Sequence, residues 1–216
     1  MPSIIELPAE LQRAMTLSWT MENNHGVAES PFSGHVQVQL GQVERWSFVM
    51  GVKPMNRRDA QIAQGFFLRL EGPVNVFRMF DPSASKPLGH GQGLPVLRVA
   101  AAAGARTVET EGWKPGTALM PGDWVQIGNQ LSKVRETAYA GADGRATLDV
   151  WPKIMHALPV QTRIMARPAR GLFRMLSDAP AWDLDAGKLL RPYEFKLSGV
   201  QVVLRGDEAP VPIGWS

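Results

Sequence analysis

Residues 57–80 of the 216-residue chain, RRDAQIAQGFFLRLEGPVNVFRMF, carry its strongest helix signal and, directly after it, a strand signal. Asn56 can cap a helix, and Asp59 in the first turn suits the positive end of the helix dipole. Gly72 and Pro73 stop the helix. Apolar residues share one face at helical spacing: Ala60, Ile62, Ala63, Phe66, Phe67 and Leu70. We therefore predict one principal helix over residues 57–70 that covers one face of a sheet, followed by a strand over 74–80.

The last four residues of this segment recur in similar form later in the chain. Phe77-Arg78-Met79-Phe80 returns in the form Phe173-Arg174-Met175-Leu176. Directly after the first copy the composition changes, because residues 81–95 hold three prolines and three glycines, which is typical of a linker or long loop. We therefore predict that the chain leaves a sheet at the first copy and re-enters the same sheet at the second.

The region between the two copies has the pattern of an all-β unit. Turn residues such as Asp143-Gly144 separate short strand signals at 96–103, 106–111, 124–127, 130–137, 146–150 and 161–166. This spacing predicts a small β-barrel or sandwich. We expect a fold that is mainly β with one principal helix. Residues 1–82 and 170–216 would form a β-sandwich or barrel domain, and residues 83–169 a small β-barrel domain inserted in it.

Strand signals also lie before the helix and near the C-terminus. Val36, Val38 and Leu40 alternate with polar residues, as in a half-buried strand, and apolar residues alternate again over 46–52. We expect these two segments to pair as an antiparallel hairpin or as adjacent strands. A long strand is predicted over residues 193–204.

The composition is that of an ordinary folded protein, with 44% hydrophobic and 20% charged residues. The formal net charge is only +3 and no run of basic residues is present, which disfavours recognition of a phosphate backbone. The absence of cysteine excludes disulfides and thiolate metal sites. We expect neither a signal peptide at residues 1–10 nor a membrane span, because no apolar run approaches about 18 residues.

The residues that could carry chemistry do not form a known motif. The histidines at 25, 35, 90 and 156 lack the spacing of a helical zinc pair. The glycines of segment 89–93 lack the strand and the helix that flank a phosphate-binding loop. The acids that could pair for glycoside hydrolysis fall in strand or turn positions: Glu109, Glu111, Asp123 and Asp149. We predict no catalytic, cofactor or metal site and expect that the protein is not an enzyme.

Several short motifs, from Ser30-Pro31-Phe32-Ser33-Gly34 to Trp151-Pro152 and beyond, occur in one order along residues 30–200 and resemble those of a tail-protein family of long-tailed bacteriophages and prophages. The first is Ser30-Pro31-Phe32-Ser33-Gly34 followed by Arg45-Trp46, where the family has Ser-Pro-Phe-Thr-Gly, a polar strand and Arg-Trp. In the inserted region the similar motifs are Gly112-Trp113-Lys114-Pro115-Gly116, Met120-Pro121-Gly122-Asp123-Trp124, Asp143-Gly144-Arg145 and Trp151-Pro152. The family is that of distal tail proteins or of closely related minor tail proteins.

What this resemblance implies is a structural protein of the virion, assembled in the host cytoplasm and carried in the tail. Distal tail proteins form a ring that joins the tail tube and the tape measure protein to the tail tip, baseplate hub or receptor-binding parts. The resemblance implies a homo-hexamer and no catalytic residue. We expect ring contacts at open sheet edges, whose unpaired backbone groups a neighbour can complete. The candidates are Val36, Val38, Leu40, Tyr193, Phe195 and Leu197.

Three alternatives stay open. The inserted region could bind carbohydrate on the virion through exposed aromatic side chains, with Trp113 and Tyr139 as candidate glycan contacts. The acids named above could serve a phage hydrolase. An OB-like barrel could bind nucleic acid without sequence recognition, which predicts steeply salt-dependent affinity.

Overall fold

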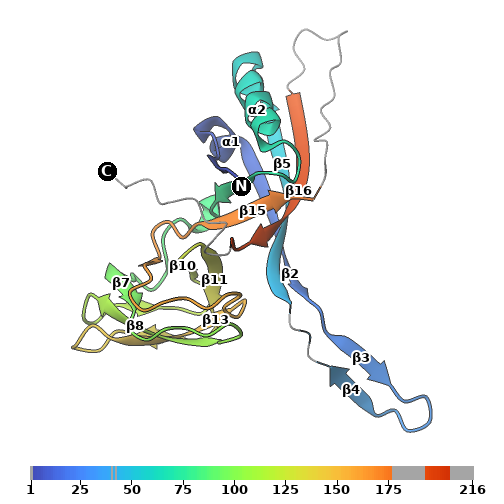
Figure 1. Ribbon diagram of the computed structural model, residues 1–216. Helices are drawn as coiled ribbons and strands as arrows, with labels where there is room; N and C mark the ends of the chain where they lie inside the picture. The colour runs from blue at the N-terminus through green and yellow to red at the C-terminus, as the bar shows by residue number, and fades with distance from the viewer. Residues whose placement is uncertain (1, 40, 42, 177–192, 205–216) are drawn as a thin grey trace.

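The computed structural model describes residues 2–39, 41, 43–176 and 193–204. Over these residues the protein is mainly β, with two α-helices, α1 (Ala9–Ala14) and α2 (Arg57–Leu70), which confirms the predicted fold class. The strands build two six-stranded sheets, here called the outer sheet and the inserted sheet, and two smaller two-stranded sheets (Figure 1).

The outer sheet collects strands from both ends of the described chain. In spatial order they are β1 (Ile4–Glu6), β6 (Val76–Met79), β15 (Gly171–Met175), β16 (Tyr193–Val202), β5 (Glu44–Met55) and β2 (Met15–Asn23). β1 runs parallel to β6, and the other neighbours are antiparallel. Phe77 in β6 and Phe173 in β15 are register partners. This pairing confirms that the chain leaves and re-enters the same sheet at the two copies of the motif.

Helix α2 has the predicted limits and covers one face of the outer sheet. The Asn56 side chain accepts a hydrogen bond from the Asp59 backbone N–H (2.9 Å), and Glu71 in the left-handed conformation (φ 50°) ends the helix. The buried face is Ala60, Ala63, Phe66, Phe67 and Leu70, with Ile62 half-buried beside it. Phe66 meets Phe77 edge-to-face, with 5.6 Å between the ring centroids. Aromatic packing therefore fixes the helix to the sheet.

The inserted sheet is nearly closed into a barrel. In spatial order its strands are β14 (Ile164–Met165), β10 (Trp124–Ile127), β11 (Gln130–Val134), β13 (Ala146–Trp151), β8 (Thr107–Trp113) and β7 (Gly93–Leu97). Val96 of β7 forms an isolated β-bridge with Arg163, the residue before β14, and the Leu97 N–H donates to the Thr162 carbonyl oxygen at 2.9 Å. A short sheet of β9 (Ala118–Leu119) and β12 (Ala138–Tyr139) adds Leu119 to the same apolar core. A 3-10 turn, η1 (Pro82–Ala84), lies between β6 and β7.

The two large sheets share a junction of aromatic side chains. Trp124 of β10 belongs to the core of the outer sheet, where its ring centroid lies 4.8 Å from that of Trp46 and 5.3 Å from that of Trp19. Gln201 of β16 crosses the junction: its side chain donates to the Leu131 carbonyl (2.9 Å) and accepts from the Trp46 N–H (3.5 Å). The inserted sheet has a core of its own, but its Trp124 and Leu131 also belong to the core of the outer sheet, so the division into an outer and an inserted domain stays a prediction about folding units.

Two strand predictions are wrong. β4 (Val36–Gln39) pairs with β3 (Gly26–Glu29) and not with segment 46–52, which lies in β5 between β2 and β16. All four residues of β4 are exposed, so its alternation does not mark a half-buried strand. The strand predicted over 96–103 belongs to β7, which ends at Leu97.

Candidate interaction surface

A hairpin projects from one end of the outer sheet. We call residues 24–43 the arm: β3 and β4 pair along it, and it extends away from both large sheets (Figure 1). Its turn is closed by two backbone hydrogen bonds, from the Ser30 N–H to the His35 carbonyl and from the Gly34 N–H to the Ser30 carbonyl, both 2.9 Å. Gly34 has a φ of +65°, which a residue without a Cβ adopts readily. The turn holds Phe32 at the outer end of the arm.

The arm exposes apolar side chains along its whole length. Among its described residues only Ser30 and Gly41 are half-buried, and the others are exposed. Phe32 is 98% exposed, and the large apolar residues Val27, Val36, Val38 and Val43 are exposed as well. A two-stranded hairpin alone in water is marginally stable, and burial of each such side chain would contribute about 1.5–3 kcal/mol. The arm therefore has the properties of a surface that another polypeptide covers.

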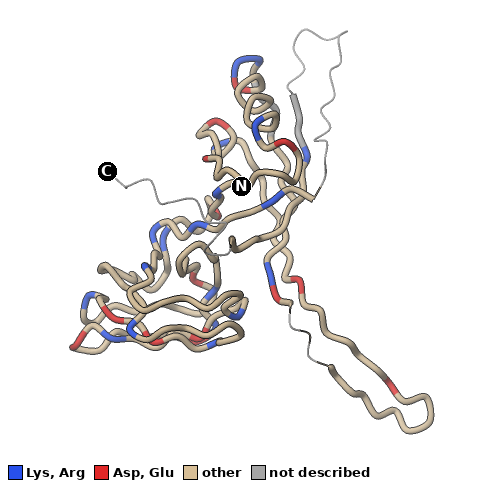
Figure 2. Tube along the Cα trace, viewed as in Figure 1, with Lys and Arg blue, Asp and Glu red and all other residues tan. Residues whose placement is uncertain are grey.

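The arm is almost free of charge. Glu29 is the only Asp, Glu, Lys or Arg between residues 24 and 43, whereas both signs of charge are spread over the inserted sheet (Figure 2). A surface that binds a polyanion needs clustered Lys and Arg, because affinity comes largely from counterion release. The arm is therefore suited to an uncharged or weakly basic protein surface and not to nucleic acid.

The base of the arm is held firmly against the inserted sheet. Glu44 is 3% exposed, forms an ion pair with Arg106, and accepts a hydrogen bond from the Lys153 N–H at 3.2 Å. The Lys153 ammonium donates to the Gly41 carbonyl at 3.4 Å. A Cβ at Gly41 would lie 1.4 Å from the Asn24 carbonyl oxygen. Only glycine therefore fits at this position, where the two sides of the hairpin approach each other closely. These contacts fix the direction in which the arm leaves the body.

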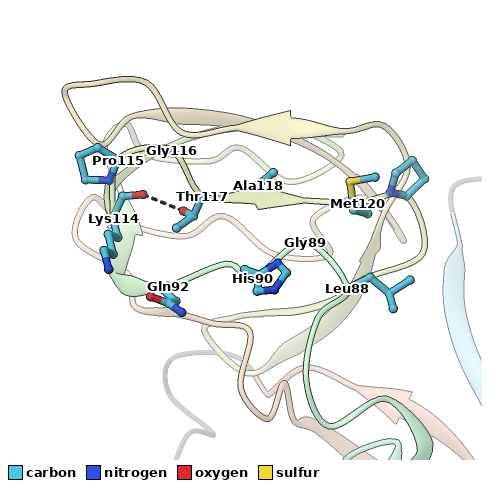
Figure 3. A pocket seen from close by; sticks show the side chains of 11 residues that line it. Leu88, Gly89, His90, Gln92, Lys114, Pro115, Gly116, Thr117, Ala118 and Met120 are labelled. Carbon is cyan, nitrogen blue, oxygen red and sulfur yellow. Dashed lines mark hydrogen bonds between the residues drawn. The ribbon is translucent and has the colours of Figure 1, made fainter.

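A second feature is an open pocket of about 700 Å³ in the inserted region (Figure 3). One end of the pocket is apolar, with Leu88 and Met120 labelled there, and the other end carries the Lys114 ammonium (Figure 3). The remaining walls come from Gly89, His90, Gln92, Pro115, Gly116, Thr117, Ala118 and Pro121. Leu88 is 78% exposed and Met120 is 38% exposed, so apolar surface faces water at this end. The pocket is within the size range of protein binding sites.

The carboxylate of Asp123 builds the apolar end of this pocket. Asp123 is 4% exposed and accepts hydrogen bonds from the backbone N–H groups of Leu88 (2.7 Å), Gly89 (3.1 Å) and Met120 (2.8 Å). Three charge-assisted hydrogen bonds satisfy this buried charge and fix both loops that line the pocket. The walls are therefore ordered before any ligand arrives.

Of the candidate interface residues in the N-terminal half, Val36 and Val38 lie on the arm and are exposed. Leu40, the third member of this group, lies outside the described residues.

The candidates near the C-terminus lie in β16, which has β15 and β5 as neighbours in the sheet. The prediction of an open edge is wrong where β15 pairs with β16, over Gly199–Val202, whereas residues 193–197 have register partners only in β5 among the described residues, so an open edge there stays a prediction. Leu197 is 5% exposed and packs in the outer core, so it does not contribute to an exposed interface. The backbones of Tyr193 and Phe195 pair with Met55 and Val52, and their interface role stays a prediction.

The two candidate glycan contacts differ in exposure, since one is buried and the other is exposed. Trp113 is 4% exposed, and its indole N–H donates to the Thr110 hydroxyl at 2.7 Å, so the prediction of a surface contact is wrong for this residue. Tyr139 is 72% exposed and is the register partner of Ala118, which lines the pocket. A glycan contact at Tyr139 stays a prediction.

The acids considered for hydrolysis have structural partners. Glu109 forms an ion pair with Arg98, and Asp149 with Arg135 at 3.2 Å, while Asp123 supports the pocket. Glu111 accepts a hydrogen bond from the Gln161 side chain at 3.3 Å. Within the described part of the chain, no group of three or more His, Asp or Glu residues could hold a metal ion. The expectation that the protein is not an enzyme stays a prediction.

Two features of this surface were not singled out from the sequence as sites. Phe32 lies in the Ser-Pro-Phe-Ser-Gly motif, and the signal that could have identified it is a large aromatic residue between turn-forming residues. The pocket depends on contacts between segments 88–92 and 114–121, which are distant along the chain, and no local pattern marks it.

A scan against protein-family models gives no match, and a search of curated proteins gives none either. Among the described residues, no helix has the length and apolar character needed to span a membrane.

Proposed function

We propose that this protein is a structural subunit of a bacteriophage tail, a distal tail protein or a close relative, and that copies of it assemble into a ring through the arm. The observation that carries the proposal is the arm itself, an exposed apolar hairpin fixed in direction by the buried Glu44 at its base. A monomer gains nothing from holding such a hairpin in water.

The motifs that resemble those of tail proteins support the place of this ring in the virion. In that proposal the ring lies at the end of the tail tube and joins the tube and the tape measure protein to the tail tip or receptor-binding parts. The number of six subunits comes from the same resemblance. The arm supports only the coarser statement, that each copy contacts another polypeptide.

The proposal is tested with purified full-length protein and with virions. Analytical ultracentrifugation and negative-stain electron microscopy are expected to give a uniform ring with rotational symmetry. Cryo-electron microscopy of the virion is expected to place this chain at the distal end of the tail tube. Monomers at every accessible concentration, together with absence of the chain from virions, would overturn the proposal.

A second candidate function is carbohydrate binding on the virion, favoured by the exposed Tyr139 beside the pocket. Burial of Trp113 leaves this function with one aromatic side chain, whereas sugar platforms commonly use several. Glycan-array binding that is lost in Tyr139→Ala, with the oligomeric state unchanged, would support it.

A further inference from the structure

We propose that Phe32, at the tip of the arm of one copy, inserts into the apolar end of the pocket of the next copy, between Leu88 and Met120. This inference rests on the proposed self-assembly and names the two surfaces that meet. The occupant of the pocket is thus a second copy of the same chain.

The arm presents Phe32 in the manner of a binding anchor. The side chain is 98% exposed, and two hydrogen bonds close the turn that carries it, so little conformational entropy is lost when it docks. Buried aromatic side chains dominate the binding energy of many protein interfaces. A phenylalanine exposed at a hairpin turn that two hydrogen bonds close is placed to fill a partner's cavity.

The pocket offers the matching cavity. Its volume of about 700 Å³ exceeds that of one phenylalanine side chain and leaves room for the neighbouring Pro31 and the turn backbone. Leu88 and Met120 supply exposed apolar surface, and Asp123 holds their loops in place. An aromatic ring that enters between them removes apolar surface of both partners from water.

The charges of the two surfaces are complementary. The arm carries one charged residue, Glu29, which is the last residue of β3 and lies beside the turn that holds Phe32. The end of the pocket opposite to Leu88 and Met120 carries Lys114 (Figure 3). In the proposed contact the arm lies along the pocket, with Phe32 at its apolar end and Glu29 at its basic end. This pairing selects one direction of docking.

The arm does not reach the pocket of its own chain. In Figure 1 the arm extends away from the inserted sheet, and the contacts of Glu44 and Lys153 fix its base. Phe32 at the tip of the arm, here called the knob, and the pocket, here called the cavity, are therefore different surfaces of one subunit. This is the condition for a heterologous, head-to-tail contact. Such contacts close into rings when the rotation between subunits permits it.

The experiment uses full-length variants that remove the knob or the cavity. Phe32→Asp puts a charge at the exposed tip, and Leu88→Asp puts one at the apolar end of the pocket. Both side chains are exposed in the free subunit, so both variants are expected to fold. Leu94→Asp is the matched control, since Leu94 is 77% exposed in the same region and does not line the pocket. The measurement is the mass distribution by analytical ultracentrifugation.

Each of the two variants alone is expected to weaken self-association at least about tenfold, with the control unchanged. An equimolar mixture of the two is expected to form a 1:1 dimer that does not grow. In that dimer the Leu88→Asp copy supplies an intact knob and the Phe32→Asp copy an intact cavity. The charge swap that combines Glu29→Lys with Lys114→Glu is expected to restore the association that either change alone reduces.

Other results would overturn the inference and are distinct from failure of the proposed function. Unchanged assembly of both variants would leave the ring intact and remove this contact. Loss of assembly in Phe32→Asp alone, with no dimer in the mixture, would place the arm on another surface. Glycan binding that is lost in Leu88→Asp while assembly is unchanged would assign the pocket to sugars. A wild type that is always monomeric would remove the proposed function itself.

Discussion

The inserted sheet and the arm are both antiparallel β structures with alternating apolar residues, yet they treat these residues in opposite ways. The inserted sheet nearly closes on itself, so residues such as Ile127 and Val150 are fully buried in its own core. The arm has two strands and no second layer in its own chain among the described residues, so Val36 and Val38 remain exposed. Alternation of apolar and polar residues therefore indicates a strand with two different faces. It does not indicate whether the apolar face is covered by the same chain or by another molecule.

The strongest test of this comparison removes the arm. Replacement of residues 25–42 by Asn-Gly joins Asn24 to Val43, where the Asn24 N–H already donates to the Val43 carbonyl at 3.2 Å. We expect complete loss of self-assembly with an unchanged midpoint of thermal unfolding for the monomer. Ultracentrifugation and circular dichroism measure the two quantities. Rings formed by the armless variant would show that the arm is dispensable for assembly.

The next test compares one buried and one exposed side chain. Ile127→Ala is expected to lower the free energy of unfolding by about 2–5 kcal/mol, because it opens a cavity in a closed core. Val38→Ala is expected to change it by less than about 0.5 kcal/mol, since the side chain is exposed and contributes little to the fold of the monomer. Denaturant unfolding of the dissociated protein gives both values. Equal losses for the two variants would contradict the distinction between the regions.

A smaller effect is expected at the carboxylate that supports the pocket. Asp123→Ala leaves three backbone N–H groups without their acceptor and should cost about 2–3 kcal/mol. The amides of Leu88, Gly89 and Met120 should then exchange hydrogen faster. The control is Asp143→Ala, where an exposed turn residue accepts from the Arg145 N–H at 3.1 Å. Slow exchange of the three amides in Asp123→Ala would mean that the loops are held by other contacts.

The smallest effect is expected at the base of the arm. Glu44→Gln removes the ionic part of the contact with Arg106, and because that guanidinium is 39% exposed we expect a loss of only about 1 kcal/mol. The control is Glu22→Gln. Glu22 forms an ion pair with Arg45, both side chains of this pair are about equally exposed, and the loss of unfolding free energy should be smaller. Unfolding in low and high salt measures the difference. A larger loss for Glu22→Gln would contradict the buried role of Glu44.

Local signals predicted much of the body of the molecule. The start of α2 follows from the cap at Asn56, and its end falls at Glu71, directly before Gly72-Pro73, where the sequence predicted it. The pairing of β6 with β15 followed from the repeated motif around Phe77 and Phe173. Each of these signals lies within a short stretch of sequence, so it predicts its element without information on the rest of the fold.

The candidate site was less predictable, because burial is decided by distant segments. The strand pattern around Leu197 is the same whether its apolar side chain packs in a core or faces a neighbouring molecule, and only contacts with distant segments place Leu197 in the outer core. Trp113 lies in a turn-rich motif typical of a surface, yet β8 places it in the inserted core. The arm shows the converse, since Val36 and Val38 have a core pattern without a core.

The register of β6 and β15 has a consequence for how this chain can change over evolution. Met79 and Gly171, where the polypeptide departs for the inserted region and comes back, are direct neighbours in the ladder. Everything between them can be exchanged for a different module, or shortened to a turn, while the backbone of the surrounding strands keeps its hydrogen bonds. A graft has to replace the contacts that cross the junction: an apolar side chain in the place of Trp124 against Trp46, an acceptor for the Gln201 side chain, and partners for the buried Glu44. The outer sheet thus offers a fixed position at which a different inserted module can be attached.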